Sequence, residues 1–325
     1  MSTCYICDNS TDNKSYVARE MMFGFKDEFE YFECGRCGCV QILEFPTEIA
    51  KYYPENYYSF QSTSVLPDKR NFLTIFADRQ RSKHNLGYGG WTGKILSKRR
   101  PEPSACGGSS LSIFDWLREA KVRLDYKILD IGCGAGYHLL DLQKNGFSNL
   151  TGIDPFIADD IFYESGVKIF KREVDEVQEQ FDFIMLNHSF EHMQNQLSVI
   201  KEVYRILKPN GYALIRIPVA SSLAWINYHT NWIQLDAPRH FFLHTVESLR
   251  LLSEQAGFKL DKVIHDSTDF QFIGSERYIR DIPLFDTENP YAPSQEEVST
   301  YKKKADDLNI NGDGDQACFY LYKSE

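Results

Sequence analysis

A glycine-rich turn behind a short apolar run most constrains what this chain can fold into. Residues 127–131 have the pattern of a buried strand, and Gly132, Gly134 and Gly136 follow it at once in the order G-x-G-x-G. Glycines at a strand-to-helix turn let the backbone lie close against a ligand. The dinucleotide pattern G-x-G-x-x-G requires a glycine at position 137, where this chain has Tyr137. The turn therefore predicts a nucleoside ligand other than a dinucleotide.

Two carboxylates accompany this turn. Asp130 lies within the predicted strand, and Asp154 ends the next predicted strand, 24 residues later. A negative charge at Asp130 would repel a pyrophosphate, whereas it suits a cationic ammonium or sulfonium group. Asp154 is placed to accept two ribose hydroxyls, as the acidic residue after a second strand does. A helix N-cap is the alternative for Asp154.

Strands and helices alternate from about residue 126 onward. The apolar pattern predicts strands at 127–131, 149–153, 167–170, 181–186, 212–217, 258–265 and 316–322, with helices such as 196–207 and 245–256 between them. This alternation is typical of a mostly parallel sheet covered on both faces. We therefore expect a doubly wound α/β fold with a seven-stranded sheet in residues 123–325. A small module at 1–45 and a linker or helical lid segment at 46–122 precede it.

The N-terminal module carries four regularly spaced cysteines. Cys4 and Cys7 form one C-x2-C pair, and Cys34 and Cys37 form a second after 26 intervening residues. Two such pairs can surround one tetrahedral Zn²⁺, and four thiolates leave no open position for chemistry. Disulfides are disfavoured in a reducing cytosol. The first ten residues lack a secretory signal pattern and no apolar stretch is long enough for a membrane span, so we expect a cytoplasmic protein with a structural zinc.

The charge is unevenly distributed. The formal net charge is -10, yet residues 61–127 hold 13 basic and 6 acidic side chains. An acidic total argues against broad nucleic-acid binding, which depends on neutralising phosphates. The basic segment could serve a phosphorylated small-molecule substrate, or it could be a solvated linker.

The order of these motifs resembles class I S-adenosylmethionine-dependent methyltransferases of the small-molecule and sugar branch. ILDIGCGAG is similar to the first motif of that family, TGIDP to the second and FDFIMLNHSFEHM to the fourth-strand motif, within residues 126–266. The C-x2-C pairs followed by YYPENYY are similar to bacterial enzymes of sugar, surface-glycan and secondary-metabolite pathways. The resemblance implies a Rossmann-like fold, S-adenosylmethionine as the cofactor and a small-molecule acceptor.

The resemblance also implies roles for individual residues. Asp130 would contact the methionine ammonium and Asp154 the ribose diol, while Asn187 would lie near the sulfonium at the end of the fourth strand. The three glycines would pass under the methionine and ribose. The residues expected beside the adenine are Pro155, Phe156, Glu173 and Val174.

Methyl transfer to a hydroxyl needs a base, and a histidine suits that task near neutral pH. His188 is the preferred candidate because the end of the fourth strand faces the methyl group in this fold, and His240 is the second. Arg239 could hold a substrate phosphate or carboxylate, with helix-start scaffolding as the alternative for Arg239 and His240. Tyr57 and Tyr58, with Tyr52 and Tyr53, could form an aromatic lid over the acceptor, or they could pack the zinc module onto the sheet domain.

Several alternatives stay open from the sequence. A divalent ion could bind His188, Glu191 and His192, because some quinone-pathway methyltransferases that this stretch resembles carry an acidic metal cluster there. The main interpretation is an O-methyltransferase for a sugar, nucleotide-sugar, glycan precursor or natural product. The alternatives are C-methylation of a keto-sugar, ribosomal RNA methylation by a zinc-module enzyme, and an interaction module on an inactive methyltransferase fold.

Overall fold

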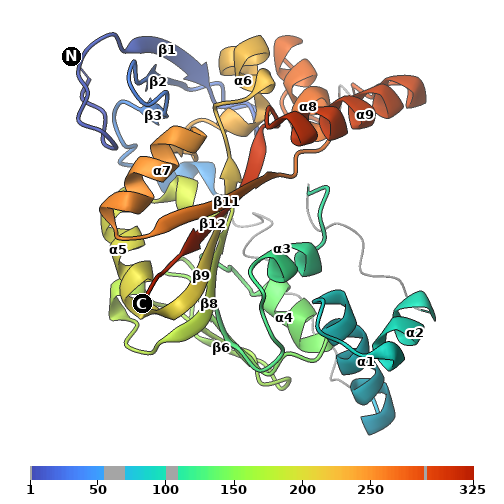
Figure 1. Ribbon diagram of the computed structural model, residues 1–325. Helices are drawn as coiled ribbons and strands as arrows, with labels where there is room; N and C mark the ends of the chain where they lie inside the picture. Colours follow the sequence, from blue (N-terminus) through green and yellow to red (C-terminus); the bar gives the residue numbers. More distant parts are fainter. Residues whose placement is uncertain (1, 55–69, 100–108, 289–290) are drawn as a thin grey trace.

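The computed structural model describes residues 2–54, 70–99, 109–288 and 291–325, which contain a large and a small β-sheet (Figure 1). The large sheet has eight strands in the order β11-β12-β9-β8-β4-β5-β7-β6. The strands are β4 (Lys127–Ile131), β5 (Asn149–Ile153), β6 (Ile161–Phe162), β7 (Lys168–Phe170), β8 (Phe181–Asn187), β9 (Leu207–Pro218), β11 (Lys259–His265) and β12 (Gln316–Tyr322).

The large sheet is mostly parallel. Strands β4, β5, β7, β8 and β9 pair in parallel, while β12 runs antiparallel to both β9 and β11 and β6 runs antiparallel to β7. The predicted α/β fold is confirmed. Each of the seven predicted strands is present, and the two-residue β6 is an additional edge strand.

Helices cover both faces of this sheet, as a doubly wound fold requires (Figure 1). On one face lie α5 (Gln196–Ile206) and α7 (Val246–Gln255), and on the other lie α3 (Ile113–Glu119) and α4 (Tyr137–Lys144). Each face buries its own apolar cluster. The other described helices of at least one full α-helical turn are α1 (Phe72–Asn85), α2 (Trp91–Arg99), α6 (Leu223–Tyr228), α8 (Phe270–Ile279) and α9 (Gln295–Asn311). None of the described helices is both long and apolar enough to cross a membrane.

One boundary differs from the sequence pattern. The strand expected from residue 212 begins at Leu207, directly after α5, because Leu207 pairs with Phe181 at the start of β8. The register then shifts between Phe181 and Phe183, which accommodates the Pro209-Asn210-Gly211 segment as an irregularity of the strand.

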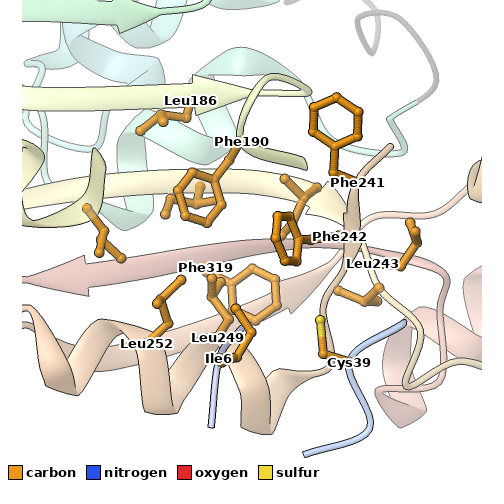
Figure 2. Close-up of a cluster of buried hydrophobic side chains, with 14 of the residues drawn as sticks. Ile6, Cys39, Leu186, Phe190, Phe241, Phe242, Leu243, Leu249, Leu252 and Phe319 are labelled. Carbon is orange, nitrogen blue, oxygen red and sulfur yellow. The ribbon is translucent and has the colours of Figure 1, made fainter. Parts of the chain in front are cut away.

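The small sheet joins the N-terminal segment to a distant part of the chain. Its order is β1-β2-β3-β10, formed by β1 (Lys14–Arg19), β2 (Glu28–Glu33), β3 (Val40–Ile42) and β10 (Phe242–Leu243). Strand β10 pairs with β3 although about 200 residues separate them, with Phe242 opposite Gln41. Figure 2 shows Phe242 and Leu243 packed with Ile6 and Cys39 of the N-terminal segment and with residues of α7 and β12. The two sheets therefore share one hydrophobic core.

Candidate functional site

The glycine-rich turn adopts a backbone shape that other residues would strain. Gly132, Gly134 and Gly136 have φ values of 73°, 52° and 80° in the left-handed region. A Cβ atom on Gly132 would also lie 2.4 Å from the Cβ of Ser189. Gly136 is the N-cap residue of α4, so the turn leads directly from β4 into a helix N-terminus. This strand-turn-helix arrangement is the one that the sequence predicts.

Asp154 ties this turn to the end of the neighbouring strand. Its Oδ2 accepts a 2.8 Å hydrogen bond from the amide of Gly134, and its Oδ1 accepts one of 2.8 Å from the amide of Phe156. A turn, not a helix, follows Asp154, so the residue is not a helix N-cap. Its carboxylate is thus held at the carboxyl ends of β4 and β5, beside the glycine turn.

Asp130 is an almost completely buried carboxyl at the same edge. Only 2% of the residue is exposed, and no hydrogen bond to its carboxylate is found among the described residues. Burial and, next, the negative charge of Asp154 raise its pKa well above the usual range. A ligand cation placed here would offset both effects, which is consistent with the cationic group that the sequence predicts at this position.

The residues expected around the adenine come from two neighbouring strand ends. Pro155 and Phe156 follow β5, and Phe156 is 76% exposed. Glu173 and the buried Val174 follow β7, which pairs with β5. Burial raises the pKa of Glu173, with further contributions from nearby carboxylates that include Asp154. The structure therefore brings these four residues to one edge of the sheet.

A buried glutamate organises the histidines after β8. His188 has a left-handed φ of 48°, and its Nδ1 donates a 3.2 Å hydrogen bond to Oε1 of Glu191. Glu191 is completely buried, and its Oε2 has no hydrogen-bond partner among the described residues. Burial opposes its ionisation, but the His188 hydrogen bond and the adjacent histidine rings lower its pKa to about 2. Glu191 is therefore an anion that orients His188.

His240 and His192 complete this cluster. The two rings contact each other edge to face with centroids 4.7 Å apart. Nε2 of His240 lies 3.9 Å from Oε1 of Glu191 and 3.9 Å from Oδ2 of Asp236. Each ring donates its Nδ1 hydrogen to a backbone carbonyl, at 2.8 Å for His192 and 2.7 Å for His240. The structure thus brings both catalytic candidates, His188 and His240, to one glutamate.

Two groups of side chains in the described part of the chain could hold a metal ion. The ligand atoms of Glu191, His192 and His240 all lie within 4.8 Å of one another, as do those of the four cysteines. The first group differs from the set suggested by the sequence, because His240 takes the place of His188.

The expectation for Arg239 is wrong in this structure. The residue is completely buried. Its guanidinium donates to both carboxylate oxygens of Asp236, to Oε1 of Glu20 and to the carbonyl oxygen of Tyr52. Because these groups surround it, Arg239 stabilises the protein interior and is not free to hold a substrate phosphate.

Tyr52 and Tyr53, the tyrosines of the proposed aromatic lid that the structure describes, have different surroundings. Tyr52 is buried, and its hydroxyl donates to Asp27 of the N-terminal segment, as expected if these tyrosines pack the zinc module onto the sheet domain. The hydroxyl of Tyr53 instead lies 3.2 Å from Nδ1 of His192. Tyr57 and Tyr58 lie outside the described residues, so their proposed contact with substrate stays a prediction.

Asn187 belongs to a partly buried hydrogen-bond chain that the sequence motifs did not reveal. Arg216 donates to Oδ1 of Asn187 at 3.0 Å, and Nδ2 of Asn187 donates to Nε2 of His138 at 2.9 Å. On its other side, Arg216 forms a buried ion pair of 2.7 Å with Asp266. Because arginine can only donate, the amide orientation of Asn187 is fixed. Its partners are far apart in sequence, and no local signal links them.

The four cysteines lie in a geometry that fits zinc. The Sγ atoms of Cys4 and Cys37 are 3.6 Å apart, and those of Cys7 and Cys34 are also 3.6 Å apart. A tetrahedral site with Zn–S bonds of about 2.3 Å has S–S edges of about 3.8 Å, whereas a disulfide requires about 2.05 Å. Gln41 donates to Sγ of Cys4 at 2.9 Å, a typical supporting contact for a ligand.

Comparison with known proteins identifies the family. A family model described as a methyltransferase domain matches residues 70–263, which is more than half of the chain. The chain belongs to the methyltransferase domain family. It is an S-adenosylmethionine-dependent methyltransferase with a Rossmann-like fold and an N-terminal four-cysteine cluster.

Individual relatives match different shares of this methyltransferase. A ubiquinone biosynthesis O-methyltransferase of Pseudomonas putida is 29% identical over 167 residues, which is 46% of this chain and 72% of the relative. Human EEF1A lysine methyltransferase 2 is 31% identical over 120 residues, 31% of this chain and 50% of the relative. A solved S-adenosylmethionine-dependent methyltransferase of Archaeoglobus fulgidus has 18% identity and a TM-score of 0.39, covering 78% of this chain and 100% of that one.

Proposed function

We propose that this methyltransferase transfers a methyl group to a hydroxyl of a small acceptor, such as a sugar, nucleotide-sugar, glycan precursor or natural product. The observation that carries the proposal is the His188–Glu191 pair, in which a buried carboxylate accepts Nδ1–H of a half-buried histidine at the end of β8. In the neutral form of His188, this hydrogen bond selects the tautomer whose Nε2 can accept a proton. Similarity to an O-methyltransferase further supports an oxygen acceptor.

S-adenosylmethionine supplies an electrophilic methyl group on a sulfonium. Asp130 would pair with its ammonium, and Asp154 would accept hydrogen bonds from its ribose hydroxyls. Gly132, Gly134 and Gly136 would allow close approach of the backbone. Pro155, Phe156, Glu173 and Val174 would lie beside the adenine, and Asn187 near the sulfonium. Four residues would thus provide the adenine side of the cofactor pocket.

His188 would remove the proton from the acceptor hydroxyl through Nε2. The negative charge of Glu191 stabilises the imidazolium that forms, since its Oε1 accepts the hydrogen bond from Nδ1–H on the opposite side of the ring. His240 faces the same carboxylate and is the second base candidate. Holding the acceptor in line with the departing sulfur provides much of the remaining rate acceleration.

Zn²⁺ on Cys4, Cys7, Cys34 and Cys37 would stabilise the N-terminal sheet without entering the reaction. Thiolate ligands suit a reducing compartment, so we place the enzyme in the cytoplasm.

A turnover assay on a panel of acceptors tests this function. Purified protein is incubated with S-adenosylmethionine and nucleotide-sugars, keto-sugars, phenolic natural products or structured RNA, and release of S-adenosylhomocysteine is measured. Methyl ethers on a hydroxyl acceptor would support the proposal. Methylation at carbon or nitrogen, or turnover with RNA alone, would contradict it.

A further inference from the structure

The segment that carries His240 is held by the N-terminal sheet along its length. The hydroxyl of Tyr31 on β2 donates a 2.9 Å hydrogen bond to the carbonyl oxygen of His240 itself. The amide of Ile42 on β3 donates to the next carbonyl, that of Phe241, also at 2.9 Å. The two residues after that, Phe242–Leu243, form β10 and pair with β3. The backbone on the C-terminal side of the histidine is thus part of the small sheet.

The residue before His240 is fixed by an ion pair to the same N-terminal segment. Nη2 of Arg239 donates to Oε1 of Glu20 at 2.9 Å, and both side chains are completely buried. Glu20 also accepts the amides of Phe23 and Phe25, so its carboxylate is held in turn. Loss of Glu20 would leave Arg239 paired with Asp236 but would remove the ion pair that ties it to the N-terminal segment.

The cysteine cluster continues this connection. The hydroxyl of Thr245 donates to the backbone carbonyl of Cys37, at the C-terminal end of the same segment. Figure 2 shows Phe242 and Leu243 near Cys39 of the N-terminal segment, in the same buried cluster as Phe190, the residue before Glu191 in the sequence. Residues 239–245 therefore connect the histidine–glutamate cluster to the zinc-binding module through contacts on both sides of His240.

We infer that Tyr31 and Glu20 are positioning residues for the methyl-transfer step. Through them, the zinc module fixes the position of the backbone segment that carries His240 in the acceptor site. The inference rests on the proposed function, in which His188, Glu191 and His240 serve the acceptor. The cofactor turn at β4 makes none of the contacts described for Tyr31 and Glu20. Substitutions that remove the contacts of Tyr31 or Glu20 should therefore lower the rate of methyl transfer to the acceptor and leave cofactor binding intact.

Tyr31→Phe and Glu20→Gln test the inference. Tyr31→Phe removes one hydroxyl, and Glu20→Gln removes one of the two carboxylate charges that face Arg239. The matched control is Tyr16→Phe, because the Tyr16 hydroxyl donates to Glu33 within the same small sheet and not to residues 239–245. A misplacement of about 1 Å can cost about 100-fold in rate, so we expect kcat to fall by about 10- to 100-fold in the two test variants. Affinity for S-adenosylhomocysteine should stay within about twofold in all three, because none of these residues lies in the cofactor turn.

A second readout needs no acceptor. In protein saturated with S-adenosylhomocysteine, NMR signals of the His240 ring are recorded at one fixed pH, with assignment from a His240→Gln variant. Tyr31→Phe and Glu20→Gln should change the chemical shifts of this ring because they move its backbone, and Tyr16→Phe should not. Zinc content is measured in each variant. Glu20→Asp, which keeps a carboxylate, should restore part of the kcat that is lost in Glu20→Gln.

The outcomes separate the two proposals. Wild-type protein that binds S-adenosylhomocysteine, with kcat and His240 signals unchanged in Tyr31→Phe and Glu20→Gln, would overturn the positioning role alone. The same kcat loss in Tyr16→Phe would also overturn it, since it would show a general effect of the small sheet. Wild-type protein that binds no S-adenosylhomocysteine would instead contradict the proposed function.

Discussion

Asp130 and Asp154 stand at the ends of neighbouring parallel strands, and the negative charge of Asp154 helps to raise the pKa of Asp130. Two carboxylates at one buried edge repel each other unless a cation or a set of donors compensates them. Asp154 has its donors in the amides of Gly134 and Phe156. Asp130 has none among the described residues, so this edge of the sheet favours a ligand that brings positive charge.

Asp130→Asn should make the free protein more stable and its cofactor binding weaker. Burial and the charge of Asp154 raise the pKa of Asp130, so the acid destabilises the folded state at neutral pH and its removal should increase the free energy of unfolding. The ammonium of S-adenosylhomocysteine loses its partner, so its dissociation constant should rise at least about tenfold. Denaturant unfolding and calorimetric titration measure the two effects. An unstabilised variant with normal affinity would contradict the role of Asp130.

The raised pKa of Asp130 predicts that both protein stability and affinity for S-adenosylhomocysteine depend on pH. Because the folded-state pKa of Asp130 is raised, its contribution to stability is fully present below the unfolded pKa of about 3.9 and is lost as pH rises through the folded value. The ligand ammonium favours the ionised carboxylate, so affinity for S-adenosylhomocysteine should increase over that pH range. Asp130→Asn should flatten both curves, and a wild-type affinity independent of pH would argue against this account.

Asp154→Ala should abolish ligand stabilisation. S-adenosylhomocysteine raises the melting temperature of a protein that binds it by mass action, and the substitution removes both the ribose acceptor and the tie to Gly134. Asp182→Ala is the matched control, because Asp182 binds Lys208 and the amide of Lys127 at the opposite end of the sheet. The control should keep the ligand-dependent shift. A full shift in Asp154→Ala would remove this residue from the site.

Cys34→Ser should lower the zinc content. We expect about one Zn²⁺ per chain in the wild type, less in this variant, and a less stable N-terminal sheet. Cys39→Ala is the control, since Cys39 lies in the same module but outside the four-cysteine group. Elemental analysis and near-UV circular dichroism check these results. Metal-free wild-type protein with the same fold would end the zinc proposal.

Glu191→Gln should lower kcat, and it should also remove a contribution to protein stability that depends on pH. The charge that orients His188 is lost, so kcat should fall by about 100-fold or more while the cofactor-dependent melting shift persists. The pKa of Glu191 is lowered to about 2, so its stabilising contribution is present above the unfolded pKa of about 4.3 and disappears as pH falls through about 2. The difference in stability between wild type and variant should therefore shrink in acid. Equal kcat in both proteins would contradict the base assignment.

Much of the large sheet could be predicted because its strands are apolar runs bounded by turn residues. The ranges 127–131, 149–153 and 316–322 agree with β4, β5 and β12 residue for residue. The register of the N-terminal sheet could not be predicted in the same way. Strand β10 has only two residues, Phe242 and Leu243, inside a continuous apolar run, and its pairing with β3 depends on tertiary packing.

The cofactor side of the site was more accessible to prediction than the acceptor side. Asp130, the glycines and Asp154 form a local motif with fixed spacing. Arg239 has the chemistry of a phosphate ligand, but its burial depends on Glu20, 219 positions away, and on Asp236. The central place of Glu191 among three histidines likewise arises from residues 188–192 meeting residue 240 in space.

A crystal structure of the protein with S-adenosylhomocysteine tests the central claim most directly. We predict that the ligand lies over the turn at Gly132–Gly136, with its ammonium against Asp130 and its ribose hydroxyls against Asp154. An empty turn in crystals soaked at saturating concentration, or a ligand bound elsewhere with both carboxylates free of it, would contradict the account.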